Sequence, residues 1–212
     1  MGDGGAAVHW DGAKWSSTVN VTGALYGIWG SAPNDVWSVG TAFRHWNGTA
    51  WSSAPAGFSY TTLRGVWGSG RTDVWVVGDG GIAAHWNGTA WTAVATGTTK
   101  NLRAVWGSAA TNAWAVGDGG TVLRWTGSAG VVLPSGTTAD LHAVWGTGPD
   151  DAWAAGYHTS EHRAVVIHWN GFAWTVVPTR VANALHAVWG ADASGPWAVG
   201  DGGTIVRWTP AP

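Results

Sequence analysis

The sequence has no cysteine and few charged residues. Without cysteine, disulfide bonds and thiolate metal sites are excluded, and cysteine usage says nothing about the redox compartment. Only 10% of the 212 residues are charged, and the 10 lysines and arginines are scattered. No basic stripe could neutralise the phosphates of a nucleic acid. No apolar run is long enough for a transmembrane helix, and the first residues lack the pattern of a signal peptide. Nucleic acid and membrane insertion are therefore not expected, and localisation stays open.

Tryptophan and glycine, by contrast, are abundant, with 20 and 34 copies. Tryptophan combines a large apolar surface with one polar N–H, so it suits cores, seams between layers and ligand platforms. Glycine at this density indicates many tight turns.

A five-residue phrase ending in Trp-Gly recurs five times, as YGIWG, RGVWG, RAVWG, HAVWG and HAVWG. Successive copies lie 38, 39, 39 and 44 residues apart, which is typical of a repeat protein. We expect one domain, residues 1–212. Its repeats begin near Leu25, Leu63, Leu102, Leu141 and Leu185.

Each repeat predicts four short strands. In residues 102–125, apolar strands are separated by a loop and by the turn Gly-Asp-Gly-Gly, which supplies the positive φ of a tight turn. In most copies an Asn-Gly turn then leads into a fourth strand. Four antiparallel strands per forty-residue repeat predict a β-propeller blade. No sustained 3.6-residue period supports a helical solenoid, and the rungs of a β-helix are shorter.

The strand count predicts how the propeller closes. With the strands of a blade named A to D, A, B and D occur five times and C occurs six times. We therefore expect an all-β, five-bladed propeller of four-stranded antiparallel blades. Its N- and C-terminal strands share the closing blade, which residues 1–20 complete. One of the two terminal C strands, ending at Trp10 and Trp208, is spare and available for self-association.

Two recurrent sets of residues are candidate ligand contacts. The D-strand tryptophans can stack on the apolar face of a sugar, or they can pack one blade on the next. They are Trp15, Trp51, Trp91 and Trp174. The residue before each C-strand tryptophan is a hydrogen-bond donor, for sugar hydroxyls or for a buried partner at the seam. These donors include His45, His85, Arg124 and His168. No metal site is expected, because arginine replaces histidine in two copies.

The hairpin phrase carries a resemblance to known lectins. Residues 45–51, HWNGTAW, and residues 10–15, WDGAKW, resemble the hairpin of fucose-binding propeller lectins of the Aleuria type. The five-blade count resembles tachylectin-type lectins, and the whole repeat resembles tryptophan-rich bacterial surface or secreted propellers. The resemblance implies several glycan sites and a secreted or surface location. Glu161 is the only glutamate, so the repeated Arg/Glu pair of the fucose binders is absent.

One segment breaks the repeat. Residues 157–163 replace the short Gly-Asp-Gly-Gly turn in the fourth copy and concentrate two histidines and Glu161. An enzyme would need such a break, but a hydrolase also needs a second carboxylate, which is missing here. We therefore expect no enzyme and no cofactor. The sequence favours a multivalent carbohydrate-binding module. The alternative is a structural or protein-interaction propeller without a small ligand, either a natural fragment or an engineered repeat protein.

Overall fold

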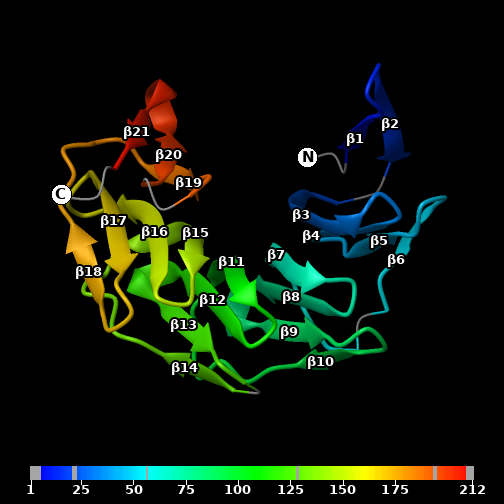
Figure 1. Ribbon diagram of the computed structural model, residues 1–212, viewed down its shortest axis with the longest axis horizontal. Helices are drawn as coiled ribbons and strands as arrows, with labels where there is room; N and C mark the ends of the chain where they lie inside the picture. The colour runs from blue at the N-terminus through cyan, green and yellow to red at the C-terminus, as the bar shows by residue number, and fades with distance from the viewer. Residues whose placement is uncertain (1–5, 21–22, 56, 128, 193–194, 209–212) are drawn as a thin grey trace.

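The computed structural model describes residues 6–20, 23–55, 57–127, 129–192 and 195–208. Six antiparallel sheets follow one another along an arc, with the two ends of the described chain at the two ends of the arc (Figure 1). The expected all-β propeller of about five blades is confirmed.

Four sheets are complete blades whose strands lie in chain order from A to D. The first contains β3 (Leu25–Ala32), β4 (Asp35–Gly40), β5 (Arg44–Trp46) and β6 (Trp51–Ser53). The second contains β7 (Leu63–Gly70), β8 (Asp73–Gly78), β9 (Ala83–Trp86) and β10 (Trp91–Ala93). The third contains β11 (Leu102–Ala109), β12 (Asn112–Gly117), β13 (Val122–Trp125) and β14 (Gly130–Val132). The fourth contains β15 (Asp140–Gly148), β16 (Asp151–His158), β17 (Arg163–Trp169) and β18 (Trp174–Val177).

The two remaining sheets are incomplete, and here the structure differs from the sequence-based prediction. The strands β1 (Ala6–Trp10) and β2 (Trp15–Asn20) pair only with each other, and β19 (Leu185–Trp189), β20 (Trp197–Gly200) and β21 (Ile205–Arg207) form a separate sheet. Among the described residues the terminal strands therefore do not share a closing blade. The physical reason is that β21 already occupies the C position beside β20, which leaves β1 without that edge. Residues 1–5 of the segment expected to complete the last blade lie outside the described residues.

The turns follow from their residues. Between strands B and C, the segments Asp79–Gly81, Asp118–Gly120 and Asp201–Gly203 form single 3₁₀ turns rather than two-residue hairpins, η1 to η3. Their central glycines have positive φ, 63° at Gly119 for example. Between strands C and D, the Asn47 side chain accepts the N–H groups of Thr49 and Ala50 at 3.0 Å each, which fixes the turn.

The recurrent Trp-Gly phrase is a contact that locks one blade onto the next. A Cβ added at Gly107 would lie 2.6 Å from the ring of Trp67 in the preceding blade, and one at Gly146 would lie 2.8 Å from Trp106. The same contact joins Trp29 to Gly68 and Trp145 to Gly190. Each tryptophan thus presses its ring edge onto the glycine of the following phrase, where any side chain would displace it.

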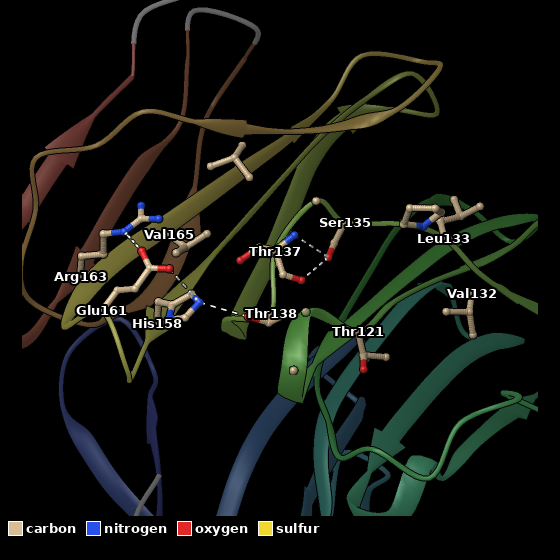
Figure 2. A pocket seen from close by; sticks show the side chains of 15 residues that line it. Thr121, Val132, Leu133, Ser135, Thr137, Thr138, His158, Glu161, Arg163 and Val165 are labelled. Atoms are coloured by element: carbon tan, nitrogen blue, oxygen red, sulfur yellow. Dashed lines mark hydrogen bonds and ion pairs between the residues drawn. The ribbon is translucent and has the colours of Figure 1, made fainter.

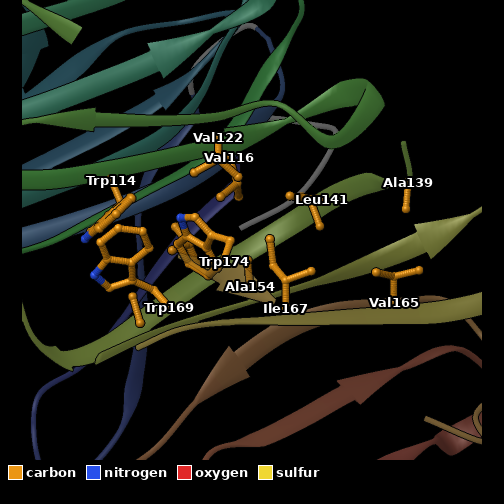
Figure 3. Close-up of a cluster of buried hydrophobic side chains, with 12 residues drawn as sticks. Trp114, Val116, Val122, Ala139, Leu141, Ala154, Val165, Ile167, Trp169 and Trp174 are labelled. Carbon is orange, nitrogen blue, oxygen red and sulfur yellow. The ribbon is translucent and has the colours of Figure 1, made fainter. Parts of the chain in front are cut away.

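The B-strand tryptophans form the centre of each seam. Trp37, Trp75, Trp114 and Trp153 are 2%, 3%, 0% and 9% exposed. In the seam between the third and fourth blades, Trp114 meets Trp169 and Trp174, and Val116 and Val122 pack beside Leu141 and Ile167 (Figure 3). The core is therefore a series of contact layers, or seams, between neighbouring sheets. The B-strand tryptophans of these four blades belong to this core.

The Trp-Gly contact predicts a large difference between two glycine-to-alanine substitutions. Gly107→Ala places a methyl group against Trp67 and the carbonyl oxygen of Asn112, 2.7 Å away, so we expect a loss of about 1–3 kcal/mol in the free energy of unfolding. Gly70→Ala is the matched control, since nothing lies within 4 Å of its added Cβ. Urea unfolding measures both, and equal midpoints would contradict the contact.

Candidate binding site

The histidines before the C-strand tryptophans are held by carboxylates at the start of the B strands. Nε2 of His45, His85 and His168 lies 2.7, 2.6 and 2.7 Å from Oδ1 of Asp35, Asp73 and Asp151. Each histidine also pairs across the strands with its B-strand tryptophan, and its ring centroid is 4.1–4.4 Å from that indole. A hydroxyl side chain near the end of the A strand completes the group, such as Ser69 of β7, which lies 2.5 Å from Oδ2 of Asp73.

The third blade substitutes both members of this pair. Arg124 replaces the histidine, Asn112 replaces the aspartate, and Arg124 Nε donates to Asn112 Oδ1 at 2.9 Å. The guanidinium lies over Trp114, 4.7 Å from its ring centroid, as the imidazoles do in other blades. The sequence shows both substitutions, Arg124 for histidine and Asn112 for aspartate, but it carries no signal that the two side chains bind each other.

The predicted ligand residues therefore lie mostly inside seams. Trp91 and Trp174 are 4% and 5% exposed and meet Trp37 and Trp114 edge to face, with ring centroids 5.2 Å apart in both pairs. Trp51 is partly buried, and only Trp15 is well exposed, at 67%. The structure thus favours the packing interpretation for Trp91 and Trp174, because neither ring has a free face for a sugar. Ligand binding by the whole set stays a prediction.

The inner rim of the arc has a second recurrent set, contributed by the A strands. A cavity of about 540 Å³ is lined by Tyr26, Arg64, Arg103, His142 and His186. Arg64 and Arg103 form ion pairs with Asp79 and Asp118 of the B–C turns, and the hydrogen bond that Arg64 donates to the Asp79 carboxylate raises the pKa of Arg64. Burial lowers the pKa of His142, whose ring stacks on His186 at 5.4 Å. The positive charges at this rim are thus largely matched by carboxylates of the same blades.

A groove of about 610 Å³ lies where the repeat is broken, between the third and fourth blades. Its apolar lining comes from Val132 and Leu133 on one side and from Val165 and Val176 on the other (Figure 2). The polar lining comes from the loop 135–138 and from the long hairpin of the fourth blade, where β16 and β17 extend past the usual turn.

The long hairpin carries three ionisable side chains that bind one another. Arg163 Nε donates to Glu161 Oε2 at 2.5 Å, and Glu161 Oε1 lies 3.3 Å from Nε2 of His158 (Figure 2). His158 Nε2 also lies 3.1 Å from the hydroxyl of Thr138, which ties the hairpin to the loop of the preceding blade. The hydrogen bond from Arg163 lowers the pKa of Glu161. Sequence analysis singled out this segment but not its contact with residues 135–138, because nothing in the sequence signals that these loops meet.

No group of three or more His, Cys, Asp or Glu side chains suited to a metal ion occurs among the described residues. In the same part of the chain, no helix is long and apolar enough to cross a bilayer.

The chain is similar to solved β-propellers. It matches YCF48 bound to a D1 peptide with a TM-score of 0.65 and 17% identity, covering 88% of this chain and 63% of that one. It matches the WD40 β-propeller domain of Doa1 with a TM-score of 0.71 and 12% identity, covering 87% and 64%. It matches the WD40 repeats of RRP9 with a TM-score of 0.75 and 12% identity, covering 98% of this chain and 71% of that one.

These similarities show the fold alone. The chain spans only 63% and 64% of the first and second of these proteins. No protein-family model and no curated protein matches the sequence. The carbohydrate-binding hypothesis gains no support from these propellers.

The contribution of the histidine–aspartate pairs to stability can be tested by a rescue experiment. Asp73 is 7% exposed and accepts from both His85 and Ser69, so Asp73→Ala leaves two groups without their acceptor. We expect a loss of about 2 kcal/mol in the free energy of unfolding. The double variant Asp73→Asn with His85→Arg copies the third blade and should recover most of that loss. Thermal unfolding measures both. Asp150→Ala on the exposed surface is the control, and an equal loss there or no rescue by the double variant would contradict the pairing.

Proposed function

We propose that this chain is a protein-interaction propeller and that the groove between the third and fourth blades binds an extended segment of another protein. The proposal rests on one observation: the long hairpin and the groove occur at the same place. The long hairpin, unique among the described blades, lines the groove of about 610 Å³.

The lining of the groove suits a peptide. Binding sites commonly combine an apolar floor with a few convergent polar groups. Val132 and Val176 are 49% and 40% exposed, although they are large apolar side chains. Their burial under an apolar side chain of a partner would be favourable.

The backbone beside the groove also suits an extended partner. β14 is the outermost strand of the third sheet, and among the described residues no strand pairs with its outer edge, although Gly130 N–H donates to the carbonyl oxygen of Ala95. Strand edges without a neighbouring strand bind extended peptides through main-chain hydrogen bonds. Gly130–Val132 replaces the tryptophan-bearing D strand of the other blades, and Val131 within it is 56% exposed.

The polar side of the groove selects for an acidic group in the partner. Glu161 engages Nε of Arg163, so the two terminal nitrogens of the guanidinium remain as donors for a second carboxylate. We therefore expect a segment with an apolar side chain for Val132 and Val176 and a carboxylate for Arg163. The solved complex of YCF48 with a D1 peptide supports the class of function, since it is a propeller of similar fold with a peptide ligand.

The experiment is selection from a phage-displayed library of random peptides, followed by titration of the selected peptides. Arg163→Glu and Val132→Asp should each weaken binding at least about tenfold, because they reverse the charge and remove the apolar floor. Arg180→Glu and Phe172→Asp change exposed residues outside the groove and serve as matched controls.

Two results would contradict the proposal. One is selected peptides that bind all four variants equally well. The other is saturable binding on a glycan array with no peptide selected, which would restore the carbohydrate-binding hypothesis.

A further inference from the structure

In the three seams between complete blades, the B-strand tryptophan meets outer rings of the following blade. Trp37 lies 4.1 Å from His45 of its own blade and 5.5 and 5.2 Å from Trp86 and Trp91 of the next blade, centroid to centroid. This arrangement buries Trp37 to 2% exposure. Trp114 has Arg124 in place of the histidine and meets Trp169 and Trp174. Trp75 meets His85 and Trp125 alone, because the D strand of the third blade has no tryptophan. A buried tryptophan in this position therefore has a C-strand histidine or arginine of its own blade and at least one outer tryptophan of the following blade beside it.

The last sheet presents the same tryptophan without the following blade. Trp197 is 46% exposed, although its counterparts in the four complete blades are at most 9% exposed. Val199 and Ile205 on the same sheet are 44% and 66% exposed, whereas their counterparts Val116 and Val122 are fully buried. Trp189, which ends the fifth Trp-Gly phrase, is 63% exposed for the same reason. These four residues form an unpartnered apolar face, here called the terminal face.

The first complete blade presents the opposite half of a seam. A cavity of about 320 Å³ is lined by His9, Trp46 and Trp51, which are the counterparts of the three rings around Trp37. Ile28, Pro33 and Val36 complete much of its apolar wall. The nearest atoms to a Cβ built on Gly30, the glycine of the first Trp-Gly phrase, belong to Val36 and Asp35 of the same blade, so no tryptophan presses on this glycine. We call this cavity the socket.

The hairpin of β1 and β2 shows which strands would fill the socket. Ala7 of β1 packs on Leu25 of the first blade, just as Val122 of a C strand packs on Leu141 of the blade that follows it. The hairpin therefore holds the place of strands C and D of a blade that has no A and B strands there. Among residues 185–192 and 195–208, the last sheet has A, B and C strands and no D strand. The N-terminal hairpin therefore offers C and D strands, and the last sheet offers the A and B strands that the hairpin does not have beside it.

We propose that β19 and β20 of a second copy of this chain dock beside β1, so that Trp197 enters the socket and Trp189 reaches Gly30. The blade formed in this way takes strands A and B from one copy and strands C and D from the other. Because β21 holds the edge of β20 that β1 needs, β20 exchanges β21 for β1. The exchange gives up the pairs of Trp197, Ala198 and Val199 with Arg207, Val206 and Ile205 of β21. In the alignment of the repeats, the matching segment of β1 is Ala7-Val8-His9. In return β20 gains a C strand that already carries its D strand.

A second copy satisfies the two ends with less rearrangement than closure of one chain on itself. The two ends lie at opposite ends of the arc (Figure 1). Bringing them together within one chain would shift several close-packed seams, and packed cores resist such deformation. Docking of a second copy leaves the complete seams as they are. The contact joins two different surfaces, so it is heterologous and can continue to further copies.

The experiment uses two full-length variants that each lose one half of the contact. Trp197→Ser removes the inserted side chain, and Ile28→Asp places a charge in the socket at a residue that is 52% exposed and therefore not needed for folding. Sedimentation velocity of the wild type should show association that increases with concentration. Each variant alone should associate at least about tenfold more weakly, and an equimolar mixture of the two should form a one-to-one complex.

Phe172→Asp is the matched control, because Phe172 is 90% exposed and belongs to neither surface. Its association should equal that of the wild type, and circular dichroism checks that all variants are folded. The proposal is overturned if the wild type is monomeric at every concentration, which would leave closure within one chain, or if the two variants associate as the wild type does. It is equally overturned if the mixture of variants shows no complex.

Discussion

The fold depends on a single contact, the insertion of a B-strand tryptophan into the next blade. This contact brings together an indole, a histidine or arginine of its own blade, and aromatic rings from the neighbouring one. It buries apolar surface where no helix or second sheet layer is available, and that burial is the main favourable term in folding. The few charged residues follow from it, because most of the interior is the surface of one sheet facing the next. The surplus of tryptophan has the same origin.

The histidine–aspartate pairs at the seams orient one of the rings in this contact. His45, His85 and His168 lie over the indoles, with interplanar angles of 25–32°, because Asp35, Asp73 and Asp151 hold their outer nitrogens. A buried polar group must find a partner, and here the partner also fixes the orientation of a ring. In the third blade Arg124 and Asn112 achieve the same result with different chemistry. What the sequence suggested as a ring of donors for a ligand is therefore mostly internal scaffolding.

Much of the fold was predictable from the sequence because the same pattern of strands and turns occurs in five repeats. The strand order, the Asn-Gly turns and the core role of Trp37, Trp75 and Trp114 follow from local patterns that recur at a fixed spacing. The state of the chain ends did not follow. Counting strands could not decide between Trp10 and Trp208 for one position, because both strands have the pattern of a C strand, Val followed by His or Arg and then Trp, and only packing distinguishes them. The binding groove was half predictable. The break at residues 157–163 was evident, whereas its contact with Thr138 depends on how two blades turn relative to each other.

The contact of Trp67 with Gly107 has a direction, since each tryptophan touches the glycine ahead of it and never the one behind. A chain built in this way can be lengthened by whole repeats. Duplication of one whole repeat inserts a tryptophan and a glycine together, and both new junctions match those already present. A deletion that removes only part of a repeat leaves a tryptophan without the glycine that it contacts, or a glycine without its tryptophan. Genes for such proteins can therefore change blade number by unequal recombination between near-identical repeats without disturbing the interior, and the two ends are the places where such changes remain visible.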